Sequence, residues 1–182
     1  HRPDAPQLPS TRPHALPSPP LSSAQFKAHY TNYEPSKKNL RTKTAKIEPL
    51  AAGSSVNQDW TGIYTTPVKD QGYCGSCWAF SATEQIESDC MRVNSETPIL
   101  SPEQITQCDS TSYGCNGGWT ENAYEYVESA GGMCSESDYP YTSGSGTTGS
   151  CKSSLPSTSC AITGYKTVSG ESSMASYVES TG

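Results

Sequence analysis

Eight cysteines, all between positions 74 and 160, constrain the fold of this 182-residue chain more than any other feature of its sequence. Reduced cytosolic proteins of this length rarely hold so many thiols. A disulfide framework, a metal site, or a set of bridges with one reactive thiol would each account for them. The cysteine-bearing region therefore predicts a covalently fastened domain and an oxidising compartment.

Charge and proline content divide the chain near residue 55. Residues 1–50 hold 8 Lys+Arg and 3 Asp+Glu, a net charge of +5, whereas residues 51–182 hold 4 and 15, a net charge of −11. Seven prolines in the first 20 residues exclude a helix or a central strand there, because proline lacks the N–H and fixes φ. We therefore predict a largely disordered, basic leader over residues 1–55 and a folded body over residues 56–182.

The composition also excludes two function classes. The acidic body argues against nucleic-acid binding, because phosphate contacts need clustered lysine and arginine. The apolar runs are far shorter than the roughly 20 residues that a membrane-spanning helix needs, so we expect no membrane span.

Apolar spacing in the body predicts helices and one strand. One face of a helix over residues 77–91 is formed by small and apolar side chains: Ala79, Ala82, Thr83, Ile86 and Cys90. Ser101 can cap a short second helix, with proline at the first position and Gln104 completing a capping box. Residues 120–130 and 172–180 have helical patterns, and residues 162–168 predict a strand. Such a body lacks a partner layer, which predicts that the chain is part of a longer fold.

Cys77 has the position of a nucleophile. It opens the first predicted helix, where unpaired N–H groups and the helix dipole favour an anion such as a thiolate. Gly72 and Gly75 allow a tight turn just before it. The side chain of Gln71 can bring an N–H close to the backbone N–H of Cys77, and two such donors can hold an oxyanion during acyl transfer.

Two other interpretations of the Cys74-x-x-Cys77 spacing remain open. A redox dithiol should follow a buried parallel strand, but residues 60–70 include Pro67, Lys69 and Asp70. A zinc site would need Cys108 and Cys115 as further ligands, and their spacing is poor for a second zinc knuckle.

Residues 71–81 (QGYCGSCWAFS) resemble the nucleophile segment of the papain-like cysteine proteases. The resemblance extends over about residues 56–182, through residues 100–104 (LSPEQ), 107–108 (QC), 114–118 (GCNGG) and 139–141 (YPY). It implies an α+β, papain-like two-domain fold. The chain would hold mainly the helical left domain and the start of the barrel-like right domain, and residues 1–55 would be the remnant of a pro-segment.

The family resemblance also implies roles for residues. Cys77 is expected to be the nucleophile and Gln71 the oxyanion donor, while the backbone of Gly117 and Gly118 binds an extended substrate. Tyr113 and Trp119 are expected to line neighbouring subsites. These roles belong to a cysteine endopeptidase that works through a thiolate acyl-enzyme, without a metal or another cofactor. The expected partners are protein or peptide substrates and cystatin-type inhibitors, and the protein is expected to be a monomeric zymogen, secreted or lysosomal/vacuolar.

The resemblance implies the disulfides Cys74–Cys115 and Cys108–Cys151. Of the three cysteines that remain besides Cys77, two lie in connecting segments, and we predict that Cys134 pairs with Cys160. Cys90 would then be a buried thiol on the apolar stripe of the first helix. The rival pairing is Cys90 with Cys134.

The histidine that protonates the leaving amine is the main departure from the family pattern. It follows the nucleophile by about 130 or more residues in the family, whereas this chain has only His1, His14 and His29. We expect none of the three to be catalytic, and we expect the family's histidine and asparagine to lie beyond this chain, which would be inactive alone. The alternatives are a non-catalytic papain-like binding or storage protein and a secreted disulfide module without a protease history.

Overall fold

The computed structural model describes residues 57–156 and 160–181. The predictions for the leader, residues 1–55, lie outside these residues. The described chain forms four α-helices, α2 (Cys77–Asn94), α3 (Pro102–Cys108), α4 (Thr120–Ala130) and α5 (Glu171–Ser180), with short 3₁₀ turns η1 (Gly114–Asn116) and η2 (Ser143–Ser145). Each helix predicted from apolar spacing is confirmed.

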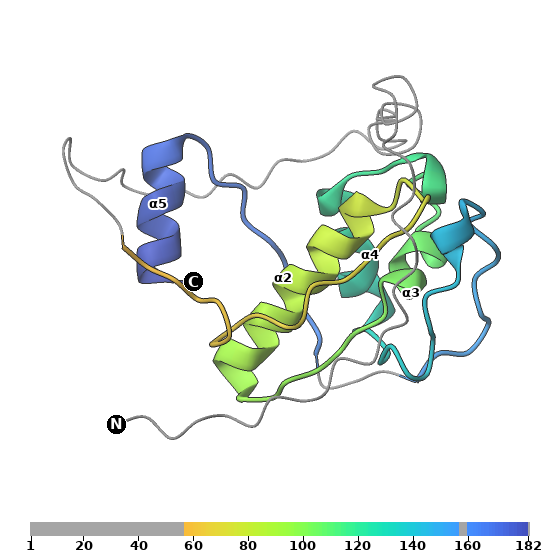
Figure 1. The fold of residues 1–182 in the computed structure, drawn as a ribbon, viewed down its shortest axis with the longest axis horizontal. Coiled ribbons are helices and arrows are strands. Elements are labelled where there is room, and N and C mark those ends of the chain that lie inside the picture. The colour runs from red at the N-terminus through yellow and green to blue at the C-terminus, as the bar shows by residue number, and fades with distance from the viewer. Residues whose placement is uncertain (1–56, 157–159, 182) are drawn as a thin grey trace, which may run out of the picture.

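The helices α2, α3 and α4 pack together around one core, and α5 lies apart from them (Figure 1). The predicted inner face of α2 is buried along its length, from Ala79 to Cys90. It meets side chains from the other two helices and the connecting segments: Leu100, Ile105, Ala123, Val127, Met133 and Cys160. No described helix is long and apolar enough to cross a membrane.

The start of α3 confirms half of the predicted capping box. The Ser101 hydroxyl accepts a hydrogen bond from the backbone N–H of Gln104 at 3.2 Å. The Gln104 side chain does not reach back to the helix start. It accepts from the backbone N–H of Cys134 at 2.7 Å and donates to the Gly132 carbonyl at 3.2 Å. Gln104 therefore fastens the segment after α4 to the buried side of α3.

The predicted strand over residues 162–168 is wrong. Residues 57–156 and 160–181 contain no strand, and an isolated antiparallel bridge joins Leu100 to Ser135. A strand needs a neighbour that satisfies its backbone N–H and C=O groups. Within residues 162–168 a β-bridge is formed at Thr167 alone, and the described part of the chain holds no neighbouring strand, so the β-favouring composition of this segment does not produce a strand.

Three disulfides are present, and one predicted pairing is wrong. Cys74–Cys115 and Cys108–Cys151 have Cα–Cα distances of 4.6 and 4.8 Å. The third bridge joins Cys90 to Cys160, with the Cα atoms 5.8 Å apart, so neither Cys134–Cys160 nor Cys90–Cys134 forms.

The reason for this third pairing lies in where the side chains are buried. Cys90 and Cys160 belong to the same core cluster, where the inner face of α2 meets the segment that leads to α5. Cys134 is buried beside α3, and its backbone N–H is bonded to Gln104. Its thiol is unbridged, and burial raises its pKa.

Candidate active site

The turn over residues 71–77 brings Gln71 and Cys77 to one end of α2. Gly72 has φ +60°, and its N–H donates to the Asp70 carboxylate at 2.9 Å. The amide of Gln71 donates to the carbonyl of Cys74 at 2.7 Å, which folds the side chain back over the turn. An amide nitrogen carries two hydrogens, so the second one remains for another acceptor.

Cys77 is the first residue of α2, and its thiol is unbridged and exposed. The N-cap residue of α2 is Ser76, which is fully buried and whose side chain makes no capping hydrogen bond. The Ser76 carbonyl accepts from the N–H groups of Ala79 and Phe80. The Ser76 side chain therefore does not occupy the N–H groups of the first turn, and those that do not donate to the Ser76 carbonyl remain available to stabilise an anion such as a thiolate.

A pocket of about 340 Å³ contains both Gln71 and Cys77. Its other lining residues come from the segment before the turn and from the N-terminal half of α2: Lys69, Asp70, Phe80, Ser81 and Glu84. The structure thus brings together the two residues predicted to act on the substrate carbonyl. Gly117, Gly118, Tyr113 and Trp119 do not line this pocket.

Gly118, one of the two predicted substrate-binding glycines, lies close to the ring of Trp78, the residue after Cys77. A Cβ on Gly118 would come within 2.6 Å of the Trp78 indole, and Trp78 Nε1 donates to the Gly114 carbonyl at 3.2 Å. The Gly117 carbonyl accepts from the N–H of Tyr113 at 2.9 Å. The disulfide between Cys74 and Cys115 and the 2.9 Å bond from the Gly75 N–H to the Cys115 carbonyl join this segment to the turn over residues 71–77.

The Cys74–Cys115 disulfide also excludes the two alternative interpretations of the Cys74-x-x-Cys77 spacing. A Cys74-x-x-Cys77 dithiol and a zinc site both need a reduced Cys74, which is bonded to Cys115. Cys108 is likewise bonded to Cys151. In the described ranges, no group of three or more His, Cys, Asp or Glu side chains is placed to hold a metal ion.

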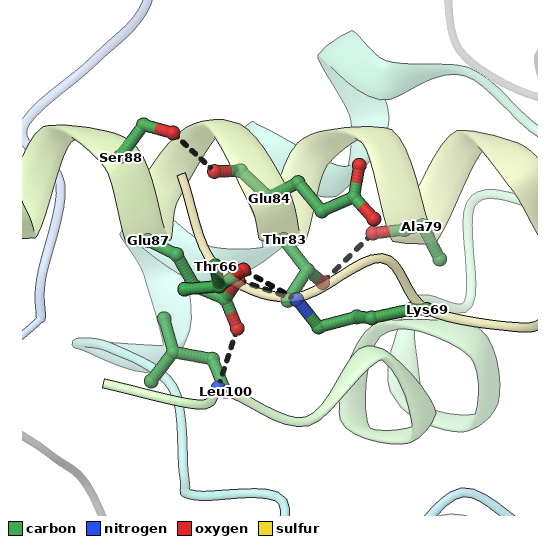
Figure 2. Close-up of polar contacts among 8 residues, drawn as sticks. All are labelled: Thr66, Lys69, Ala79, Thr83, Glu84, Glu87, Ser88 and Leu100. Atoms are coloured by element: carbon green, nitrogen blue, oxygen red, sulfur yellow. Dashed lines mark hydrogen bonds and ion pairs between the residues drawn. The ribbon is translucent and has the colours of Figure 1, made fainter. Parts of the chain in front are cut away.

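A buried ion pair between Lys69 and Glu87, which was not predicted from the sequence, supports the segment before the turn. Figure 2 shows Glu87 reaching from α2 toward Thr66, Lys69 and the backbone N–H of Leu100. One carboxylate oxygen accepts from Lys69 Nζ and from the Thr66 hydroxyl, both at 2.5 Å, and the other accepts from Leu100 N at 2.7 Å. Glu87 is fully buried, so these three donors replace its hydration.

Substitution of Gly72 tests whether the turn over residues 71–77 depends on the close approach of its backbone to Gly144. Gly72→Ala and Gly62→Ala both place a Cβ at positive φ, +60° and +71°, which costs roughly 1–2 kcal/mol. A Cβ on Gly72 would lie 2.5 Å from the Gly144 carbonyl oxygen, whereas a Cβ on Gly62 meets nothing within 4 Å. Because two backbone segments must separate, we expect Gly72→Ala to lose about 1–3 kcal/mol more in urea unfolding. Equal losses for the two variants would contradict this account.

Comparison with known families gives one clear match. The papain family cysteine protease model matches residues 52–182. The senescence-specific cysteine protease SAG12 of Arabidopsis thaliana is 34% identical over 155 residues, which cover 81% of this chain and 44% of that protein. Digestive cysteine proteinase 1 of Homarus americanus is 39% identical over 149 residues, 80% of this chain and 44% of that protein.

Solved structures give the same result. A digestive procathepsin L2 proteinase from Tenebrio molitor larval midgut superposes with a TM-score of 0.74 at 29% identity, covering 89% of this chain and 54% of that one. A recombinant stem bromelain precursor has a TM-score of 0.67 at 32% identity, covering 87% and 51%. The chain therefore spans about half the length of these relatives.

Proposed function

Because the chain belongs to the papain family of cysteine proteases, we propose that it supplies the nucleophile and the oxyanion hole of a cysteine endopeptidase. The observation that supports this most is the exposed, unbridged thiol of Cys77 at the first residue of α2, in the same pocket as Gln71. Of the eight cysteines, six are bridged and Cys134 is buried. Cys77 is therefore the one thiol of the chain that a substrate can reach.

The proposed reaction begins with attack of the Cys77 thiolate on the carbonyl carbon of a peptide bond. A carbon–sulfur bond forms, the carbonyl becomes an oxyanion, and the Gln71 amide and the Cys77 backbone N–H donate to it. The tetrahedral intermediate then collapses, the carbon–nitrogen bond breaks, and the leaving amine takes a proton from a general acid. Water attacks the remaining thioester and releases the acid product and the thiol.

We place the substrate along Gly117 and Gly118, where an extended peptide would pair with the backbone. Gly118 is partly exposed, whereas Gly117 is buried and its N–H and carbonyl are bonded to Gly114 and Tyr113, so Gly118 is the more accessible of the two. Tyr113 and Trp119 would then contact side chains of that peptide. Protein or peptide substrates are accordingly the proposed partners, and cystatin-type inhibitors would compete for the same surface. The protein is proposed to act as a monomer.

The general acid of this mechanism is not among the described residues, because the three histidines of the sequence are His1, His14 and His29. We propose that the histidine and its orienting asparagine lie in sequence that follows residue 182. Residues 1–55 would be the remnant of an inhibitory pro-segment, and residues 56–182 the N-terminal part of the peptidase domain. The precursor forms among the structural relatives support a zymogen. We propose that it is secreted or sent to a lysosome or vacuole, because its three disulfides need an oxidising compartment.

The test compares the full-length protein with a polypeptide of these 182 residues. A dipeptidyl fluorogenic amide, assayed under mildly reducing conditions that spare the disulfides, should be hydrolysed by the former and not by the latter. The shorter chain has a nucleophile but no general acid beside it. Turnover by the 182-residue chain would refute the placement of the histidine, and a full-length protein without turnover would refute the peptidase proposal.

A further inference from the structure

The hydroxyl of Tyr141 lies between the two segments that would form the oxyanion hole. It donates to the Gln71 carbonyl at 3.0 Å, and it lies 2.8 Å from the Ser76 hydroxyl. A phenol has a single proton, and a carbonyl oxygen can only accept. The Tyr141 proton therefore goes to Gln71, and Ser76 donates its own proton to Tyr141.

Ser76 uses its hydroxyl in an unusual way for a residue at a helix start. A serine at the N-cap ordinarily accepts a hydrogen bond from an N–H of the first turn. Ser76 makes no such bond, and its hydroxyl is instead committed to Tyr141. One hydroxyl group thus connects the backbone of Gln71 with the residue immediately before Cys77.

Tyr141 is itself held by packing and by a hydrogen bond. Its ring meets the ring of Phe80 edge to face, with centroids 4.8 Å apart and an interplanar angle of 84°. Its N–H donates to the Glu136 carboxylate at 2.8 Å. Burial raises the pKa of the phenol to about 12, so the hydroxyl keeps its proton at any pH at which a peptidase would be assayed.

The segment that follows Tyr141 is anchored by Glu103, a fully buried carboxylate on α3. One of its oxygens accepts from the hydroxyls of Thr142 and Ser143, at 2.6 and 3.0 Å. The carbonyl of Gly144 then accepts from the N–H of Tyr73 at 2.8 Å. Residues 141–144 therefore contact the turn at Gln71 and again at Tyr73.

We propose that Tyr141 is a positioning residue of the oxyanion hole. By bonding to the Gln71 carbonyl and to the Ser76 hydroxyl at once, it fixes the separation between the Gln71 amide and the backbone N–H of Cys77. It touches neither the substrate nor the reacting atoms. This role rests on the proposed peptidase function.

The test is Tyr141→Phe in the full-length protein, with Tyr139→Phe as the matched control. The first variant keeps the ring against Phe80 and removes only the hydroxyl. The control removes a buried hydroxyl of the same motif that bonds instead to the side chain of Gln107 and the carbonyl of Ser150. Thermal unfolding of both variants shows whether either change is merely a loss of stability.

Three readouts separate positioning from a general structural defect. Tyr141→Phe should lower kcat about 10- to 100-fold with little change in KM, as expected when donors move by a fraction of an ångström. A peptide aldehyde, whose hemithioacetal oxygen occupies the hole, should bind more weakly by a similar factor. Alkylation of Cys77 by iodoacetamide creates no oxyanion, so its rate should stay unchanged. Tyr139→Phe should leave all three quantities close to those of the unsubstituted protein.

Two results would overturn the positioning role. One is an unchanged kcat and aldehyde affinity in Tyr141→Phe. The other is a parallel fall in turnover and in the iodoacetamide rate, which would indicate a disturbed thiol. Failure of the proposed function itself would be seen separately, as the absence of turnover in the unsubstituted full-length protein.

Discussion

Replacing Cys77 by alanine is expected to abolish peptide hydrolysis by the full-length protein, with kcat falling at least about 10⁴-fold. The substitution removes the sulfur that forms the acyl-enzyme. The oxyanion donors that remain account for only a small part of the rate acceleration. Initial rates with a dipeptidyl fluorogenic amide measure the loss. Mass spectrometry of the unsubstituted protein, quenched with acid during turnover of an ester substrate, should find the acyl group on the peptide that contains Cys77.

Cys134→Ala provides the matched control, because Cys134 is the other unbridged cysteine of the chain. Its thiol is buried and acts as a small apolar side chain, so its loss should cost on the order of 1 kcal/mol of stability and leave kcat unchanged. An acyl group on any other residue, or substantial turnover by Cys77→Ala, would show that the nucleophile has been assigned to the wrong side chain.

The helices could be predicted from the sequence because their information is local. The stripe from Ala79 to Cys90 and the Ser101 cap are each set by residues within about three helical turns of each other, and both are present in the structure. The predicted strand at residues 162–168 failed because a strand depends on a partner elsewhere in the chain. The spacing of apolar residues within one segment does not show whether a partner strand is present.

The third disulfide shows the same limit at the level of single residues. The apolar stripe correctly indicated that Cys90 is buried, but burial does not say what is packed against the side chain. In the structure Cys160 enters the same core, and Cys134 is held away beside α3 by Gln104. The location of Cys134 and Cys160 in connecting segments did not predict the pairing correctly, because the pairing depends on contacts between residues 70 positions apart in the chain.

The candidate site was only partly predictable for a related reason. Cys77 and Gln71 stand in one short motif, and the structure places them in one pocket. The links from Tyr141 to Gln71 and to Ser76 cross 70 and 65 residues, so no local pattern contains them. Glu87 did leave a signal, because it lies four residues after Thr83 and therefore on the predicted inner face of α2. A carboxylate at such a position needs a buried partner.

Glu87→Ala is expected to be the most destabilising substitution in this part of the molecule. It leaves Lys69 Nζ largely buried without its counter-ion and removes the acceptor of the Leu100 N–H. Removing one partner of a buried ion pair typically costs about 3–5 kcal/mol, because the remaining charge is uncompensated. Urea unfolding with the disulfides intact should show a lower midpoint at an unchanged slope.

Glu84→Ala on the same helix is the control for this substitution. Figure 2 shows both side chains on α2, and Glu84 is exposed, so its loss should change the free energy of unfolding by less than about 0.5 kcal/mol. Glu87→Gln separates charge from shape, because its amide oxygen can still accept from Leu100 N while Lys69 loses its ion pair. Its stability should therefore fall between those of Glu87→Ala and the unsubstituted protein. A loss below about 1 kcal/mol for Glu87→Ala would mean that water reaches Lys69 and that the pair does not support the segment leading to the turn over residues 71–77.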